Sequence, residues 1–354
     1  MCARPMTTND TTASPACGPQ AGQRLPVRVT PFYRRQIERS DCPEPLRRMV
    51  ELAPAESEAA GQSDTSGEYD NTIIVGLQHK YAQTVLVLTT QQCFGYCRYC
   101  FRRRFVGQEP SEAVADYPAV AAYIRGHPEI SNVLLTGGDP LTLDSDRLGG
   151  IIDQLLPIPH VTSIRFGTRA IAFAPDRFRD PKLLAQFDRI RSAGKACVVV
   201  THINHASEIS GEAESVVDGL RRADVQLLNQ AVLLNGVNDD PDVLTALFEK
   251  IQSLGIHPYY LFQARPVLGA CHFQVPLDRG IAIVHAVNSR LSGIQKMFRF
   301  IMSHRSGKIE ILDLAADGRL HMRYHQSPDP MQVGRVFSRP YRRGACWLDD
   351  LPET

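Results

Sequence analysis

The chain has 354 residues, of which 43% are hydrophobic and 22% are charged, so it can form one large globular domain with appendages or two ordinary domains. Its formal net charge of +1 argues against a nucleic acid or a membrane surface as a partner. No apolar run approaches the roughly 20 residues that cross a bilayer, and the first residues lack the apolar core of a secretory signal. We therefore expect a cytoplasmic, thiol-reducing setting.

The N-terminal part of the chain divides into a tail and an extension. Residues 1–27 are rich in Thr, Pro, Gly and Ala and lack apolar periodicity, so we expect a disordered tail. Residues 28–82 are expected to form a helical extension, with helical structure over 30–58 and a flexible loop over 58–72.

From residue 83 to residue 290, short apolar runs alternate with amphipathic stretches of helical period. The runs are rich in β-branched and aromatic residues, as buried strands are. Strands are expected at 84–90, 132–138, 163–169, 196–204, 226–234 and 258–263, and helices at 112–127, 144–156, 181–195, 211–223 and 239–255. This alternation predicts an α/β fold in the form of a partial (β/α)6 barrel with right-handed crossovers.

Residues 291–354 are expected to form a small C-terminal α+β region. It contains two strand-like runs, 308–314 and 319–325, joined by a turn with Asp and Gly.

Polar residues follow most of the predicted barrel strands at the point where each strand ends. In barrels of this kind, function gathers at the C-terminal ends of the strands. The residues concerned are Cys93, Gly137, Gly138, Asp139, Thr168, Arg169, His202, Asn204 and Arg265. We expect them to converge on one site.

Three of the nine cysteines, Cys93, Cys97 and Cys100, form a C-x3-C-x2-C cluster directly after the first barrel strand. Structural zinc takes four ligands, and no fourth Cys or His lies nearby in the sequence. An iron–sulfur cube held by three thiolates keeps one iron open for a substrate or cofactor. We favour the iron–sulfur cluster; a zinc loop completed by a distant ligand and a fortuitous cluster are the alternatives.

This cysteine loop resembles that of the radical S-adenosylmethionine (SAM) superfamily, which has an aromatic residue, here Tyr99, before the third cysteine. Five segments in the same order resemble the lysine 2,3-aminomutase-like family: 97–107, 133–141, 201–209, 229–239 and 257–262. The resemblance runs from about residue 30 to about residue 308, which is most of the chain.

The resemblance implies that Cys93, Cys97 and Cys100 hold a 4Fe–4S cluster whose open iron binds SAM. One electron from the cluster, supplied by a donor such as flavodoxin or ferredoxin, then cleaves SAM and gives a 5′-deoxyadenosyl radical. That radical takes a hydrogen atom from an unactivated carbon of a small amino-acid substrate. The sequence leaves open whether the protein forms a homo-oligomer.

The same comparison gives roles to further residues. Gly137 and Gly138 would let the backbone approach the methionine part of SAM, and Tyr99 would lie beside the adenine. Asp139 would either accept a hydrogen bond from the SAM ammonium or cap the next helix. Other strand-end residues would face the cofactor, with barrel packing as the alternative for each: Gly167, Thr168, Arg169, His202, Asn204 and Gln230.

The resemblance also implies pyridoxal 5′-phosphate (PLP). Lys308 matches the family's Schiff-base lysine, and the alternative is an exposed lysine at a strand edge. Lys80 stands where the family has an arginine near the phosphate, whereas Thr84 replaces a second arginine. We therefore expect PLP as a third cofactor.

The substrate is not expected to be lysine. Arg102 matches the family's carboxylate-binding position, but the two aspartates that bind the distant ammonium in lysine enzymes match Arg265 and Ile301. A guanidinium in place of a carboxylate favours a substrate with a negative or hydrogen-bond-accepting far end. The alternative for Arg265 is a pair with a barrel carboxylate or with the PLP phosphate. Arg103 and Arg104 are expected to be solvated or structural.

The sequence thus predicts a radical SAM isomerase, a PLP-dependent 2,3-aminomutase acting on a small amino acid, with glutamate and aspartate as the expected type. The alternatives are a PLP-independent radical SAM enzyme (dehydrogenation, decarboxylation or epimerisation) and a non-catalytic metal-binding protein.

Overall fold

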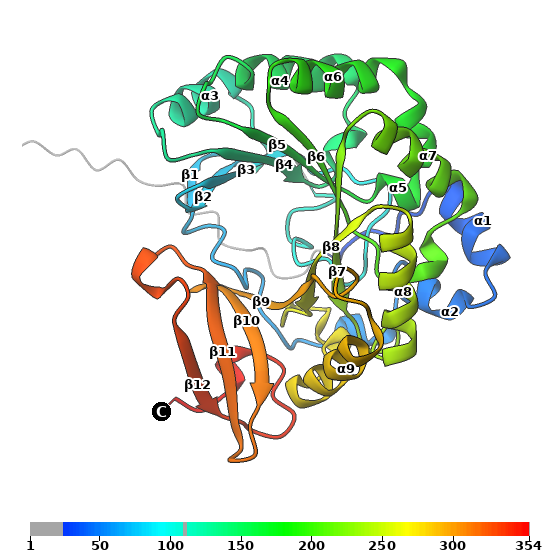
Figure 1. Ribbon diagram of the computed structural model, residues 1–354, viewed down its shortest axis with the longest axis vertical. Helices are drawn as coiled ribbons and strands as arrows, with labels where there is room; N and C mark the ends of the chain where they lie inside the picture. Colours follow the sequence, from blue (N-terminus) through cyan, green and yellow to red (C-terminus); the bar gives the residue numbers. More distant parts are fainter. Residues whose placement is uncertain (1–23, 109–111, 354) are drawn as a thin grey trace, which may run out of the picture.

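A computed structural model of the chain describes residues 24–108 and 112–353 (Figure 1). Most of the tail expected at 1–27 therefore lies outside the described residues. The twelve strands of the described ranges form one sheet, in which they follow one another in sequence order from β1 to β12. None of the helices in these ranges is long and apolar enough to span a membrane.

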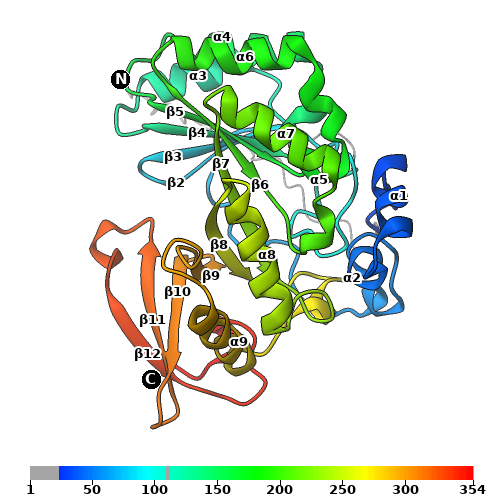
Figure 2. The same ribbon diagram turned by 45° about the vertical axis from the view of Figure 1, so that its right-hand side comes forward.

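Seven consecutive strands of this sheet pair in parallel. They are β3 (Thr84–Thr90), β4 (Asn132–Gly137), β5 (Ser163–Thr168), β6 (Ala196–Thr201), β7 (Gln226–Leu233), β8 (His257–Gln263) and β9 (Arg299–His304). The first six are the predicted barrel strands. The sheet curves but does not close, because β1 and β12 at its two ends do not pair with each other (Figures 1 and 2). The expected partial barrel is confirmed.

The connecting helices cover the outer face of the curved sheet (Figure 2). They are α3 (Tyr117–Arg125), α4 (Ser145–Leu155), the short α5 (Ala170–Phe173), α6 (Pro181–Ser192), α7 (Gly211–Arg222), α8 (Pro241–Ser253) and α9 (Leu277–Arg290). Five of them begin at an Asp or Ser whose side chain accepts a backbone N–H of the first turn: Asp116, Asp144, Asp180, Ser210 and Asp240. Such caps stop each helix from extending back into the site loops.

The C-terminal region continues the barrel sheet. The two expected strands are β10 (Gly307–Leu314) and β11 (Arg319–Gln326), and β12 (Val336–Pro340) follows as an antiparallel edge. The sequence analysis missed β9 and β12. β9 pairs in parallel with β8, so the barrel extends into this region. β12 is short and ends in proline, which weakens the sequence signal of a strand.

The N-terminal extension contains strands as well as helices. Helices α1 (Pro31–Arg39) and α2 (Pro43–Arg48) match the expectation for 28–82. Strands β1 (Thr72–Ile74) and β2 (Leu77–Tyr81) were not expected. β2 pairs antiparallel with the edge of β3, and β1 pairs antiparallel with β2. The extension therefore completes one side of the barrel sheet.

In the segment 58–72, which was expected to be a flexible loop, residues 65–68 are instead buried beside the site, whereas residues 58–62 and 69–70 are exposed. Ser66 and Glu68 are buried. Gln62 forms an isolated β-bridge with Val267, and the Asp64 carboxylate accepts hydrogen bonds from the backbone of Ser66 and Tyr69. Its polar side chains, which suggested a solvated loop, thus form bonds both within the segment and to the rest of the protein.

Carboxylates of this extension hold the arginines that surround the cysteine cluster. Glu56 pairs with Arg98, whose side chain is fully buried, and with Arg103 at 2.7 Å. Glu68 pairs with Arg102 at 2.7 Å and with Arg104 at 2.8 Å. Burial alone would raise the pKa of Glu56, but the hydrogen bonds from its arginines lower it below its usual value. Arg103 and Arg104 are thus structural.

Removing one carboxylate of this buried network should destabilise the protein. Glu56→Ala leaves the buried Arg98 without its partner, so we expect the free energy of unfolding to fall by about 3–5 kcal/mol. Asp218→Ala, which breaks the exposed pair with Arg222, is the control and should change it by less than about 1 kcal/mol. Chemical denaturation measures both, and equal losses would contradict the structural role of Glu56.

Candidate active site

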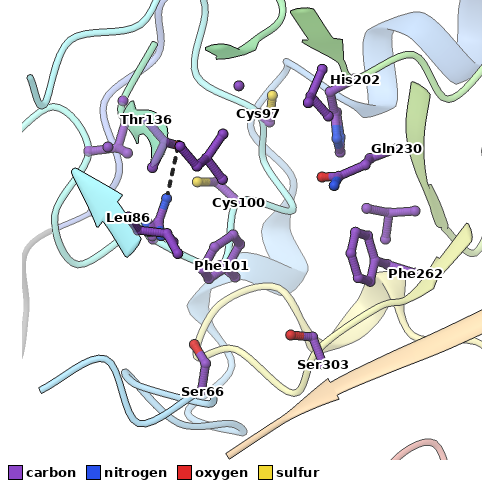
Figure 3. Close-up of a pocket in the computed structure, with 18 of the residues that line it drawn as sticks. Ser66, Leu86, Cys97, Cys100, Phe101, Thr136, His202, Gln230, Phe262 and Ser303 are labelled. Carbon is purple, nitrogen blue, oxygen red and sulfur yellow. Dashed lines mark hydrogen bonds between the residues drawn. The ribbon is translucent and has the colours of Figure 1, made fainter. Parts of the chain in front are cut away.

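A cavity of about 330 Å³ opens inside the barrel, at the C-terminal ends of the parallel strands. The predicted site residues that line it are Lys80, Cys93, Cys97, Tyr99, Cys100, Arg102, Gly137, Gly138, Asp139, Gly167, Thr168, Arg169, His202, Gln230, Arg265 and Lys308. In the view of Figure 3, Cys97 and Cys100 lie on one side of the cavity, and Ser66 and Ser303 lie on the opposite side. The cavity therefore has a cysteine end and a far end.

The three clustered cysteines fit an iron–sulfur cube. All three line the cavity as free thiols, while Cys197 is buried in the core away from it. Burial raises the pKa of Cys100 to about 11 and also raises the pKa of Cys93, so loading with metal must release protons. Within the described ranges no three Cys, His, Asp or Glu side chains converge on one ion. A cube takes each thiolate on a separate iron.

The glycines after β4 allow a close approach of two backbones. The Gly137 φ angle is +117°, in a region that favours glycine. A Cβ at Gly137 would collide with the Thr90 carbonyl oxygen, and one at Gly138 would collide with that of Gln92. These two residues lead into the cysteine loop, so the glycines set the position of that loop. That these glycines also let the backbone approach the methionine part of SAM stays a prediction.

Asp139 joins the ends of β4 and β5. Its carboxylate accepts hydrogen bonds from the Leu141 N–H at 3.0 Å, the Thr168 hydroxyl at 2.8 Å and the Arg169 N–H at 2.8 Å. Burial raises the pKa of Asp139 to about 6. The capping role is therefore present, and a contact with the SAM ammonium stays a prediction.

A polar network surrounds Tyr99 at the cysteine end. Arg169 donates to the Tyr99 hydroxyl at 2.8 Å and to the Cys97 sulfur at 2.8 Å. The His202 ring lies 2.9 Å from the same hydroxyl, and burial next to Arg169 lowers the pKa of His202 to about 3, so the ring is neutral. Asn204 does not line the cavity. It donates to Tyr99 at 2.7 Å from behind and is a positioning residue.

Lys308 faces the cavity from the start of β10 and is not the exposed edge lysine of the alternative interpretation. Its Nζ lies 5.0 Å from the ring centroid of Tyr260 and 5.5 Å from that of Tyr81. Burial, aided by the positive charges of Arg165 and Arg265, lowers the pKa of Lys308 to about 7. Much of this amine is therefore neutral and nucleophilic near pH 7.

Lys80 is held at the rim of the same end. Its Nζ donates to the backbone oxygens of Ser66 and His304, both at 2.9 Å. Burial lowers the pKa of Lys80 to about 8, and Arg265 also lowers it. Positive charges thus gather at the far end of the cavity.

Arg265 and Arg102 differ in their partners. The Arg265 guanidinium donates to the Ser66 hydroxyl at 2.7 Å and stacks 3.9 Å from the ring centroid of Phe101. No carboxylate of the described residues lies within ion-pair distance of it, and burial lowers the pKa of Arg265 only to about 10, so it stays charged. Arg102, in contrast, already pairs with Glu68. The described structure therefore contains no ion pair between Arg265 and a barrel carboxylate.

The structure corrects one sequence match and adds one residue. Ile301 is fully buried and does not line the cavity, whereas Ser303 of the same strand does (Figure 3). Both residues point to the same face of β9, but Ser303 lies two residues nearer the C-terminal end of the strand, where it pairs with Lys308 at the cavity. The sequence analysis also missed Arg165 in the middle of β5, whose buried Nε has no hydrogen-bond partner in the described structure. An arginine inside an apolar strand was the available signal.

No family model matches the chain, but several proteins are similar to it over most of its length. A putative L-lysine 2,3-aminomutase of Aquifex aeolicus (strain VF5) is 38% identical over 333 residues, which are 94% of this chain and 89% of that protein. A glutamate 2,3-aminomutase of Clostridioides difficile (strain 630) is 34% identical over 78% of this chain and 64% of that protein. An L-lysine 2,3-aminomutase of Clostridium subterminale is 35% identical over 77% of this chain and 65% of that protein.

Among solved structures, a radical SAM methyltransferase from Sphaerobacter thermophilus matches with a TM-score of 0.43 and 17% identity, over 64% of this chain and 68% of that one. The similarity to these aminomutase relatives over most of the chain defines the class as 2,3-aminomutases, which are isomerases. The chain belongs to the lysine 2,3-aminomutase family. The expected family and enzyme class are confirmed.

The close approach at Gly138 predicts a defect in metal loading. Gly138→Ala should displace the chain that enters the cysteine loop, lower the free energy of unfolding by about 1–3 kcal/mol and reduce the iron bound after anaerobic reconstitution. Gly219→Ala in α7 is the control, because its Cβ would point into open space and should stabilise the helix by roughly 0.5–1 kcal/mol. Normal iron content and stability in Gly138→Ala would show that the approach is not needed.

Proposed function

We propose that the protein is a PLP-dependent 2,3-aminomutase that acts on a small acidic amino acid, such as glutamate or aspartate, rather than on lysine. One observation carries the proposal. A single cavity contains three thiols at one end, a lysine with a lowered pKa at the other, and Arg265, a cation without a carboxylate partner in the described structure. A small amino acid held between the two ends would contact both.

At the cysteine end, Cys93, Cys97 and Cys100 would hold the cluster. The cluster and SAM supply the radical that removes hydrogen from the substrate, after one electron from a donor such as flavodoxin or ferredoxin. The role of the protein is to orient SAM and the substrate. Tyr99, fixed by Arg169, and the backbone after β4 would shape the space for SAM.

At the far end, Lys308 would bind PLP covalently through its neutral amine. PLP supplies the conjugated system over which the migrating nitrogen and an unpaired electron are shared. Lys80 retains positive charge at pH 7 and would face the phosphate. Thr84, in place of a second arginine, also lines the cavity and offers a hydroxyl.

The charges of the cavity favour an acidic substrate. Arg102 would bind the α-carboxylate, and Arg265 with Ser303 would bind the side-chain carboxylate. Glu68 and Asp139 are the acidic residues that line the cavity in the described structure, and both are already bonded to other groups. A lysine side chain would place its ammonium near Arg265 with no free carboxylate, which is a large electrostatic cost.

The lowered pKa of Lys308 predicts how the attachment of PLP depends on pH. Only the neutral amine attacks the aldehyde, so the rate of attachment should rise with a midpoint near pH 7, whereas an ordinary lysine titrates near pH 10.4. Stopped-flow absorbance after mixing with PLP measures the rate. Borohydride trapping and peptide mapping should place the pyridoxyl group on Lys308, and Lys308→Ala should abolish it. Trapping on another lysine, or a midpoint near pH 10, would contradict the assignment.

Loss of Arg265 should weaken substrate binding selectively. A charge-assisted hydrogen bond is worth about 1.5–3 kcal/mol, so Arg265→Ala should raise the Kd of glutamate or aspartate at least tenfold while the Kd of SAM stays unchanged. Calorimetry on the protein loaded with iron and PLP measures both constants.

Two controls separate the interpretations of Arg265. PLP affinity should also stay unchanged in Arg265→Ala; a loss of PLP would assign this arginine to the phosphate instead. A panel of amino acids tests the substrate class, and lysine as the best substrate with glutamate and aspartate inert would refute the proposal.

A further inference from the structure

Positive charge is concentrated in one short N-terminal segment. Residues 24–48 contain seven arginines and three carboxylates, a net charge of +4, whereas the whole chain carries +1. The remainder of the chain is therefore slightly acidic. The arginines are Arg24, Arg28, Arg34, Arg35, Arg39, Arg47 and Arg48.

These seven arginines are not used in ion pairs with carboxylates of the described ranges, unlike the arginines of 98–104. All except Arg48 are exposed. Arginines that only solubilise a protein are normally interspersed with acidic residues. Residues 24–39 hold five exposed arginines and one exposed carboxylate, Glu38. Such an excess of one sign, on a chain that is otherwise neutral to acidic, points to an acidic partner.

This basic segment is the outer cover of the cysteine loop. The Arg28 carbonyl oxygen accepts a hydrogen bond from the Tyr96 N–H at 3.0 Å, and the Arg28 side chain donates to Gln92 at 2.9 Å. Gln92 is exposed and directly precedes Cys93. Arg28 therefore links the protein surface with the residue that precedes the first cysteine.

Helix α1 is anchored to the same place. Tyr33 stacks on Phe173 with ring centroids 4.3 Å apart, and the Phe173 ring is so close to Gly95 of the cysteine loop that no Cβ would fit there. The buried side of α1 thus faces the loop, and Arg34 and Arg35 on its other side are exposed. Figures 1 and 2 show α1 and α2 together on one side of the barrel, away from β10 to β12.

We propose that residues 24–39, the part of the basic segment that covers the cysteine loop, are the docking surface for a small acidic protein that carries single electrons. This inference rests on the proposed function, because only a cluster in the cysteine loop requires such a carrier. One electron leaves the carrier, which is oxidised by one unit, and enters the cluster, which is reduced by one unit. The Arg28–Gln92 contact joins that surface to the residue next to Cys93.

A complex between this protein and an electron carrier is favoured by opposite charges on the two surfaces. Electron-transfer encounters bury small interfaces and must dissociate after each transfer, so they rely on charge to raise the association rate. A partner that only needs to approach within reach of the cysteine loop can bind such a surface without a deep pocket. Salt should weaken the encounter, because exposed charges are screened over about 10 Å at 0.1 M ionic strength.

The test compares two charge reversals of equal size. Arg34→Glu/Arg35→Glu changes the proposed surface, and Arg342→Glu/Arg343→Glu changes two exposed arginines of the C-terminal region. The protein loaded with iron and SAM is mixed with reduced flavodoxin, an acidic carrier, and cluster reduction is followed by absorbance at low and high salt. We expect the first variant to be reduced at least tenfold more slowly at low salt, with a flattened salt dependence, and the second to behave as the unchanged protein.

Reduced methyl viologen, a small cation that needs no docking surface, is the second arm. It should reduce all three proteins at equal rates. Equal slowing of both variants by flavodoxin, or no slowing of Arg34→Glu/Arg35→Glu, would overturn the docking proposal. Failure of the unchanged protein to bind iron, or to cleave SAM after reduction by methyl viologen, would instead overturn the proposed function.

Discussion

The pairing of two carboxylates from the N-terminal extension with the arginines of 98–104 is the interaction on which the site depends. Glu56 and Glu68 each pair with two arginines, and these pairs bind the segment 56–68 to the cysteine loop and the residues that follow it. Ser66 is thereby placed beside Arg265 and Lys80 at the far end of the cavity. Without these pairs, several buried guanidiniums would lie unneutralised next to the cluster loop.

The same pairing explains the charge of the cavity. The arginines of 98–104 are neutralised by the extension, and Arg169, which contacts Cys97, is paired with Glu208. In contrast, Arg165, Arg265 and Lys308 at the far end have no carboxylate partner in the described structure. Positive charge is therefore left where a phosphate and the side chain of an acidic substrate would bind. The lowered pKa of Lys308 follows from this arrangement, because burial and neighbouring cations both disfavour the ammonium form.

Much of this fold could be predicted because its signals are local. Six barrel strands, their helices and the cysteine loop each carry their own periodicity or spacing, as 84–90 and Cys93 show. The burial of residues 65–68 could not be predicted, because the arginines that pair with Glu68 lie 34 and 36 residues further along the chain. Ile301 and Ser303 share one face of β9, so the choice between them depends on where along the strand the cavity lies, which neither spacing nor composition specifies.

Transfer of deuterium between the two ends of the cavity tests the central claim most directly. The protein, loaded with iron, SAM and PLP and reduced anaerobically, is given glutamate carrying deuterium at C3. If the radical formed at the cysteine end reaches an acidic amino acid held by Lys308 and Arg265, deuterium is recovered in 5′-deoxyadenosine and the amino group moves from C2 to C3. Formation of 5′-deoxyadenosine without deuterium from glutamate or aspartate, but with transfer from labelled lysine, would contradict the account.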